Sequence, residues 1–161
     1  MYGKKCINKY LNHKKPFDSC GMIVLDVDSF KLVNDNYGHL FGDKVLARLA
    51  MLLKEVFRDN DSILMRAGGD EFVIFVKDIL NIELVRKNVE LMQKIRNLQF
   101  GKTGCTITCS AGCCYLPENV SGYTYDQLFE NADIALYKAK ERGKNCYVYC
   151  DSLQHFSSMI A

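Results

Sequence analysis

The sequence predicts an α+β fold in which helices pack on a partly antiparallel sheet. Segments whose apolar residues recur at helical spacing alternate with short apolar runs that are typical of strands. Two of these runs, at about 63–65 and 72–76, flank a polar stretch that contains Gly68 and Gly69, which is the pattern of a β-hairpin. The 161 residues match one domain, and the 48% apolar content is sufficient for a core. A hairpin among interleaved helices and strands makes the sheet at least partly antiparallel.

The N-terminal part is expected to form a helix followed by a buried strand. A helix over about 2–14 ends before Pro16, which cannot continue it. Residues 21–25 are almost wholly apolar and lead into Asp26, as in a strand at the centre of a sheet. A polar connection is expected through 34–38.

Three amphipathic helices are expected at about 40–57, 81–98 and 125–141. Their inward residues are Val45, Leu46, Leu49, Leu52, Leu53 and Val56 in the first, Leu84, Val85, Val89, Met92 and Ile95 in the second, and Leu128, Ala132, Ala135, Leu136 and Ala139 in the third. Thr124 is placed to cap the last of these helices, and Gly143 is placed to end it.

Two more strands complete the sheet, at about 104–115 and 146–150. In the first, one face carries Cys105, Ile107, Cys109, Ala111 and Cys113, and the other carries Thr106, Thr108 and Ser110. Alternation of this kind predicts a half-buried strand. Residues 151–161 form either an ordered extension or a frayed tail of a single domain over 1–161.

Composition excludes several classes of protein. A net charge of +2 gives no broad basic surface for a nucleic acid polymer. The apolar runs are shorter than the roughly 20 residues of a membrane span, and no signal peptide is evident. The eight cysteines include no CxxC pair. Those in the stretch 105–113 are interpreted as small buried hydrophobes rather than as metal ligands, and the many unpaired thiols suggest a reducing, cytoplasmic compartment.

Acidic side chains gather where strands end. Asp26 and Asp28 close the buried strand, and Asp70 and Glu71 lie at the hairpin tip. If the sheet sets these ends side by side, the carboxylates repel one another unless a cation lies between them. Such oxygen-rich sites suit Mg²⁺ bound together with substrate phosphates. The alternative is that these acids are ordinary turn and strand-end residues.

Three blocks of sequence, together with one short strand end, resemble the GGDEF family of diguanylate cyclases. Residues 68–72 read Gly-Gly-Asp-Glu-Phe, which is the family's signature. Residues 26–43 are similar to its DxDxFKxxNDxxGHxxGD block, 132–145 to its late ADxALYxAKxxGxN block, and 110–112 to its SxG strand end. The resemblance implies a palm-like, ferredoxin-like sheet of mostly antiparallel strands, akin to that of nucleotidyl cyclases.

The resemblance also implies a reaction and its participants. Two domains meet in a transient homodimer, and each holds one GTP. The 3′-hydroxyl of each GTP attacks the α-phosphate of the other, with Mg²⁺ or Mn²⁺ bound, and the products are cyclic di-GMP and two pyrophosphates. The implied metal ligands are Asp26, the carbonyl of Val27 and Asp70, and the implied catalytic acids are Asp70 and Glu71.

The implied substrate-binding residues fall into three sets. Asn34 and Asp43 read the guanine edge, although capping of the long helix is an alternative role for both. The phosphates lie near Phe30, Lys31, Lys140 and Lys144. The remaining members of the set are His39, Gly68 and Gly69.

Some positions depart from the family pattern. Lys144 stands where the family usually has Arg, and so lacks the two-pronged guanidinium. Arg58 and Asp61 resemble the inhibitory product site, but Asp61 lies one residue further from Gly68 than in the family pattern. The family's N-terminal DxLTGLxNR stretch is incomplete here. The chain is therefore expected to lack a regulatory domain, and to be cytoplasmic or the cytoplasmic part of a larger or membrane-bound protein.

Two other functions compete with the cyclase. A module that binds GTP or cyclic di-GMP without turning it over is favoured by these departures. An enzyme that makes cyclic GMP-AMP is disfavoured, because relatives of that kind lack the Asp at the position of Asp43.

Overall fold

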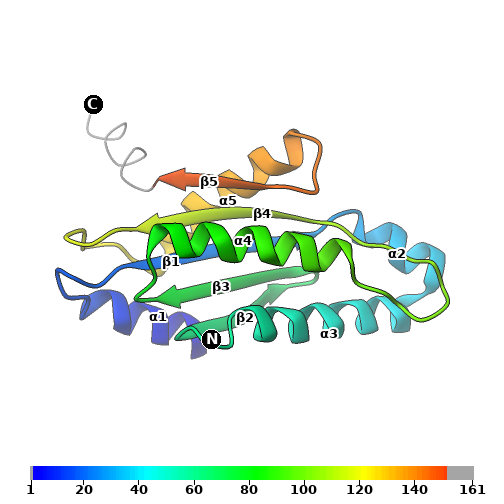
Figure 1. Ribbon diagram of the computed structural model, residues 1–161, viewed down its shortest axis with the longest axis horizontal. Coiled ribbons are helices and arrows are strands. Elements are labelled where there is room, and N and C mark those ends of the chain that lie inside the picture. The colour runs from blue at the N-terminus through cyan, green and yellow to red at the C-terminus, as the bar shows by residue number, and fades with distance from the viewer. Residues whose placement is uncertain (1, 152–161) are drawn as a thin grey trace.

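One five-stranded sheet runs through the middle of the molecule in the computed structural model, which describes residues 2–151 (Figure 1). The strands are β1 (Cys20–Val27), β2 (Ser62–Gly68), β3 (Glu71–Lys77), β4 (Cys109–Leu116) and β5 (Tyr147–Asp151), in the order β2-β3-β1-β4-β5. The central β1 is antiparallel to β3 and β4, and β4 and β5 are parallel. The predicted α+β fold with a mostly antiparallel sheet is confirmed.

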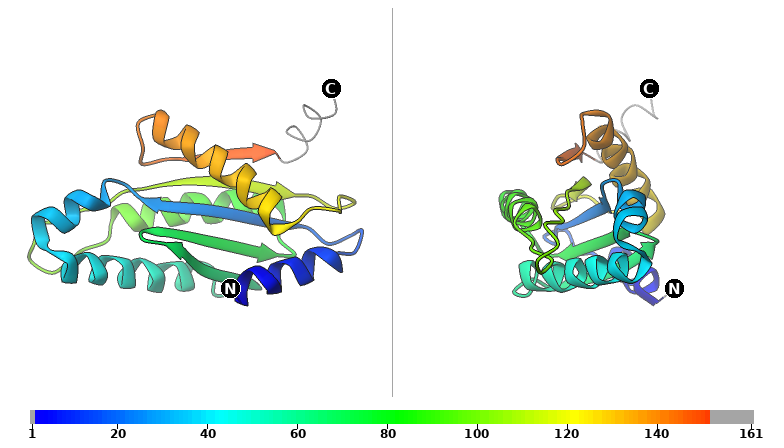
Figure 2. Two further views of the ribbon diagram at one scale, coloured as in Figure 1. Left: turned by 180° about the vertical axis from the view of Figure 1, so that it is seen from behind. Right: turned by 90° about the vertical axis from the view of Figure 1, so that its right-hand side faces the viewer.

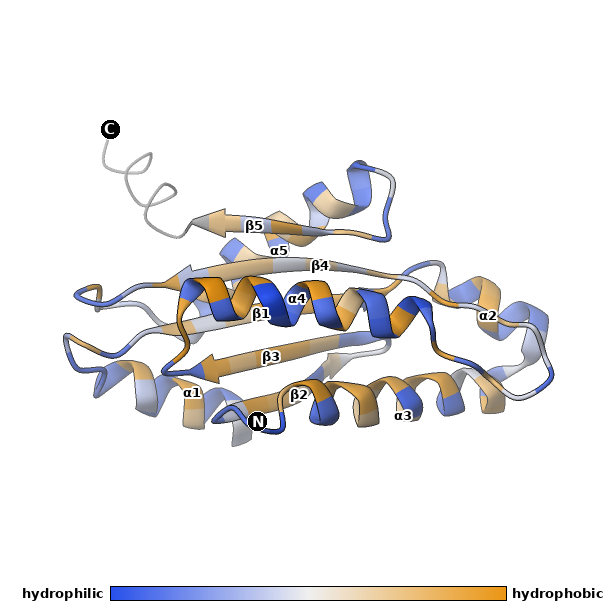
Figure 3. Ribbon diagram, viewed as in Figure 1, coloured by the Kyte–Doolittle hydropathy of each residue, from blue (hydrophilic) through white to orange (hydrophobic). Residues whose placement is uncertain are grey.

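Helices cover both faces of the sheet. Figure 1 shows α3 (His39–Val56) and α4 (Asn81–Arg96) on one side, and Figure 2 shows α1 (Tyr2–Asn12) and α5 (Tyr125–Glu141) on the other. Successive side chains of a strand point to opposite faces, so β1 sends Ile23 into one core and Val24 into the other. Figure 3 shows β2 and β3 largely apolar, and polar and apolar residues alternating along α4.

The long helices follow the sequence pattern closely. All six predicted inward residues of α3 are buried, and so are the five predicted in α5. Thr124 caps α5, because its side chain accepts a hydrogen bond from the backbone N–H of Gln127 and the Gln127 side chain accepts one in return. Gly143 follows the helix with a φ of 105°, as expected of a glycine just past a helix end.

Two helical predictions need correction. Residues Phe30–Tyr37 form a further helix, α2, where a polar connection was expected. Only Val33 of α2 is buried, so the sequence carries no helical stripe there. In α4 the predicted inward Val89 is 42% exposed, and Asn88 and Leu91 are buried instead.

The β4 region was also predicted only in part. The strand begins at Cys109, and residues 105–108 approach it outside the sheet. Its second face is buried too, since α5 packs so closely that a Cβ on Gly112 would lie 1.9 Å from the Ala132 carbonyl oxygen. The prediction that this strand is half-buried was therefore wrong.

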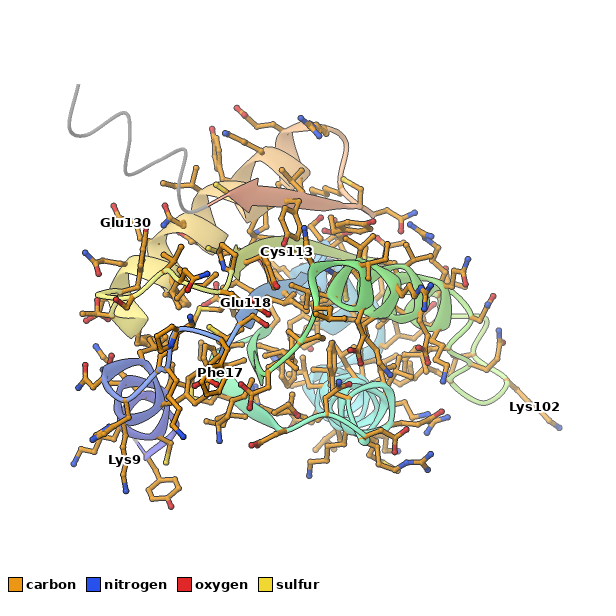
Figure 4. All side chains as sticks on the ribbon, turned by 60° about the vertical axis from the view of Figure 1, so that its left-hand side comes forward. Lys9, Phe17, Lys102, Cys113, Glu118 and Glu130 are labelled. Atoms are coloured by element: carbon orange, nitrogen blue, oxygen red, sulfur yellow. The ribbon has the colours of Figure 1, made fainter. Side chains whose placement is uncertain are left out.

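The interior and the surface separate clearly in Figure 4, where Cys113 lies inside beneath α4 and Lys102 projects outward. Cys105, Cys109 and Cys113 are buried, as predicted. Within residues 2–151, no helix combines the length and apolar character of a membrane span. The predicted tail over 152–161 lies outside the described residues.

Candidate active site

The ends of several elements meet at one edge of the sheet. In the antiparallel pairing of β1 with β3, Asp26 lies opposite Glu71. The backbone N–H of Val27 donates to the carbonyl of Asp70 over 3.4 Å, which ties the end of β1 to the β2–β3 turn. The sheet thus sets Asp26 beside Asp70 and Glu71, which is the condition on which the expected cation site depends.

The acidic side chains at this edge are electrostatically strained. Partial burial, together with the facing Asp26 carboxyl, raises the pKa of Asp70 to about 6. Burial first, and then repulsion from Asp133 and Asp26, raises the pKa of Glu71. Lys140, near the end of α5, forms an ion pair with Oδ2 of Asp26. The structure therefore brings Asp26, the adjacent pair Asp70 and Glu71, and Lys140 together from three distant parts of the sequence.

The arrangement fits a small divalent cation. Oδ1 of Asp26 is buried without a hydrogen-bond partner. Among the residues from 2 to 151, no three His, Cys, Asp or Glu side chains form a complete metal cluster. Mg²⁺ needs only one or two carboxylates when substrate phosphates and water supply its other ligands. Asp26 and Asp70, with the adjacent carbonyl of Val27, are the groups that could hold it.

A pocket of about 480 Å³ lies between α3 and the β2–β3 hairpin. Its lining includes Asp43, Arg66 and Phe72, and its volume is within the usual range for a small-molecule site. Asn34 lies outside that lining, within α2 and beside Gly42 of α3. Its Oδ1 is buried without a partner, and a Cβ on Gly42 would lie 1.9 Å from that oxygen. Gly42 thus makes room for the Asn34 side chain.

Basic residues cluster where α2 begins. Phe30 and Lys31 are its first two residues, and the preceding Ser29 has a left-handed φ of 54°. Nζ of Lys144 lies 3.3 Å from Oγ of Ser29. Backbone N–H groups at a helix N-terminus attract anions. With Lys140 nearby on Asp26, this end of the site could bind phosphate groups.

The other predicted substrate residues lie at turns and helix ends. Gly68 ends β2, and the carbonyl of Gly69 accepts a hydrogen bond from Nε of Arg66 over 2.7 Å. An added Cβ would meet nothing within 4 Å at Gly68 or Gly69, so the surface beside both is open. His39 is the exposed first residue of α3.

Arg58 and Asp61 lie apart from this edge. They follow α3 and precede β2, so β2 separates them from Gly68 at its other end. Arg58 pairs with Asp59 at 3.5 Å, and Asp61 pairs with Lys77 at 3.3 Å. Neither contact joins Arg58 to Asp61.

The role of Asp28 was not recognised from the sequence. Its carboxylate accepts hydrogen bonds from Oγ1 of Thr108 at 2.7 Å, Oγ of Ser110 at 2.6 Å and the backbone N–H of Asn145 at 2.9 Å. It therefore joins the end of β1 to the start of β4 and to the loop after α5. The hydroxyls at Thr108 and Ser110, on the polar face of the predicted strand, were the available signal.

Comparison with known proteins is consistent with this geometry. The family described as "Diguanylate cyclase, GGDEF domain" matches residues 4–146. Diguanylate cyclase DgcS of Shewanella oneidensis is 34% identical over 146 residues, which is 91% of this chain and 47% of DgcS. Cyclic di-GMP phosphodiesterase PdeR of Escherichia coli is 33% identical over 139 residues, which is 86% of this chain and 20% of PdeR.

The fold has a close structural counterpart as well. The active GGEEF domain of a diguanylate cyclase from Vibrio cholerae superposes with a TM-score of 0.78 at 26% identity, covering 94% of this chain and 92% of that one. The chain spans less than half the length of DgcS and of PdeR. A family match over residues 4–146, with the signature turn beside Asp26, establishes that the chain belongs to the GGDEF family of diguanylate cyclase domains.

Proposed function

We propose that this chain is a diguanylate cyclase that condenses two GTP into cyclic di-GMP and two pyrophosphates. The observation that carries the proposal is the facing pair of Asp26 and Asp70, with Lys140 paired to Oδ2 of Asp26. Paired carboxylates beside a cluster of lysines suit a reaction in which a metal and a triphosphate bind together.

Each step has a group in this chain to perform it. A carboxylate at the β2–β3 turn, Asp70 or Glu71, accepts the proton of a 3′-hydroxyl. A pKa near 6 leaves Asp70 ionised yet basic at neutral pH. The 3′-oxygen forms a bond to the α-phosphorus as the bond to the β-phosphate oxygen breaks, and pyrophosphate leaves. Bound Mg²⁺ or Mn²⁺ supplies charge stabilisation for the phosphates.

Other residues bind and orient the nucleotide. Lys31, Lys140 and Lys144 offset the charge of the triphosphate. Asn34 and Asp43 recognise guanine, since a carboxylate accepts hydrogen bonds from the N–H groups that adenine lacks. The Asp43 carboxylate is exposed in the structure, and a base that covers it without pairing with it loses affinity, which provides the discrimination.

The reaction requires two copies of the domain, because each GTP supplies the 3′-hydroxyl that attacks the other. We therefore propose a transient homodimer whose population rises with protein concentration. An attached regulatory domain would raise the effective concentration of one copy near the other.

A turnover assay with GTP and Mg²⁺ tests the proposal. Nucleotides are separated by chromatography over a range of protein concentrations. We expect cyclic di-GMP to form at a rate that rises more steeply than linearly with protein, and Asp70→Ala to abolish it. A linear dependence would contradict the dimer, and no product at any concentration would contradict the cyclase.

The second candidate is a module that binds GTP or cyclic di-GMP without catalysis. The similarity to part of a phosphodiesterase, PdeR, favours it, as does Lys144 in place of the family's Arg. Fusion to a dimeric coiled coil distinguishes the two candidates. Calorimetric binding of GTP by the fused dimer, with no product formed, would support the binding module.

A further inference from the structure

The loop after α5 has an unusual backbone. Gly143, Lys144 and Asn145 are consecutive and have φ values of 105°, 65° and 52°. Residues other than glycine rarely adopt such angles, and they keep them only where surrounding contacts impose the conformation. A strained segment that carries a lysine at a functional site calls for contacts that hold it.

Two side chains, those of Asp28 and Arg96, form hydrogen bonds with Asn145. The carboxylate of Asp28 accepts a hydrogen bond from its backbone N–H at 2.9 Å. Arg96, the last residue of α4, donates from Nε to Oδ1 of Asn145 at 2.8 Å and from Nη2 to its carbonyl oxygen at 2.9 Å. A single Arg thus fixes both the side chain and the backbone of Asn145 through two donors.

The loop held by these contacts places Lys144 at the end of the site where α2 begins. Its Nζ lies 3.3 Å from Oγ of Ser29, just before α2. We propose that Arg96 is a positioning residue that acts through Asn145 to hold Lys144 where the GTP triphosphate binds. This inference rests on the proposed function, and it assigns a role in nucleotide binding to a residue on α4, outside all three family motif blocks.

If Arg96 served only to stabilise the fold, its removal would lower the melting temperature. Arg96 is exposed, and its two hydrogen bonds end on Asn145 rather than in the core. Exposed polar contacts contribute little to the free energy of unfolding. Loss of Arg96 should therefore leave the melting temperature almost unchanged while it frees the loop.

Binding of two guanine nucleotides in Mg²⁺ tests the role. The non-hydrolysable α,β-methylene analogue of GTP carries the triphosphate, and GMP lacks its two outer phosphates. We expect Arg96→Ala to weaken the analogue by about three- to tenfold and GMP much less. Arg86→Ala, at an exposed position on the same helix, is the matched control and should bind both as the wild type does.

A double-mutant cycle locates the effect at Lys144. If Arg96 acts through Lys144, Arg96→Ala should weaken the analogue no further once Lys144→Ala is present. Arg96→Lys should restore only part of the affinity, because the lysine ammonium cannot reproduce the two parallel donors of the guanidinium. Additive losses, equal weakening of GMP, or no loss in Arg96→Ala would overturn the inference. Failure of the wild type to bind the analogue would instead overturn the proposed function on which it rests.

Discussion

The carboxyl of Asp70 faces that of Asp26 at the junction of the β2–β3 turn with β1, and it is near enough to hydrogen-bond it when protonated. Without such a proton, Oδ1 of Asp26 is a buried acceptor with no donor. Two acids placed in this way repel each other until a proton or a cation intervenes. Repulsion between the two carboxylates thus lowers the free energy of unfolding and creates a site that binds positive charge.

This repulsion predicts a pH dependence of stability in the absence of metal. The pKa of Asp70 is about 6 in the folded protein, against 3.8 for an unperturbed carboxyl. The folded state then holds the proton more tightly than the unfolded chain, so the free energy of unfolding falls as pH rises from about 4 to 6. Urea denaturation in EDTA from pH 4.5 to 7.5 should show a smaller fall in Asp70→Asn. Parallel curves for the two proteins would contradict the raised pKa.

Lys140 is expected to matter far more than its neighbour Lys138. Removal of Lys140 leaves the Asp26 carboxylate without its ion pair and takes a positive charge from the phosphate end of the site. We expect Lys140→Ala to lower kcat/KM for GTP by about tenfold or more, as for other charge-assisted contacts. Lys138→Ala, exposed on the same helix, should change it little. Equal effects of the two substitutions would refute the role of Lys140.

A substitution at Gly42 tests the proposed contact between Asn34 and guanine, because the Asn34 side chain packs against this glycine. A Cβ there would lie 1.9 Å from Oδ1 of Asn34 and 3.1 Å from Cζ of Phe30. Gly42→Ala should therefore displace the Asn34 side chain and weaken GTP binding about as much as Asn34→Ala does. Calorimetry on both variants and on their combination checks this. If the combined variant binds no worse than Asn34→Ala, the glycine acts through the asparagine.

Substitution by alanine should destabilise the protein to different extents at two glycines of adjacent strands, Gly112 and Gly21. At Gly112 the new Cβ meets the backbone of α5, 1.9 Å from the Ala132 carbonyl oxygen and 2.3 Å from the Leu136 nitrogen. At Gly21 it meets Cδ2 of Leu84 at 2.5 Å, and a side chain can move. We expect Gly112→Ala to lower the free energy of unfolding by about 3 kcal/mol or more and Gly21→Ala by about 1. Urea denaturation would contradict this packing if the order were reversed.

Product inhibition tests the resemblance of Arg58 and Asp61 to the family's inhibitory product site. Both side chains are largely exposed, and each now pairs with another residue that a ligand could displace. We expect added cyclic di-GMP to slow the initial rate of the wild type and to slow that of Arg58→Ala much less. The rate without product should be the same in both. Equal inhibition of both proteins would place the inhibitory site elsewhere.

Local signals explain what could be predicted. In α3 and α5 the helical stripe and the cap at Thr124 act within a few residues of one another, so the sequence identifies both helices. In α2 one buried residue, Val33, leaves no stripe to detect. The second buried face of β4 depends on α5, which follows later in the chain and packs on Gly112.

The α+β class, the main helices and strands, and the motif residues of the site could be predicted from the sequence, because propensity, periodicity and motif spacing are local properties of the chain. The tertiary structure was needed to place Asp70 against Asp26, and to bring Asp28 and Arg96 each into a hydrogen bond with Asn145. These contacts link residues that are distant in sequence, and strand register and helix packing decide which of them meet. For that reason each acid could be recognised from its motif, while the contacts that hold Asn145, and through it Lys144, could be seen only in the folded chain.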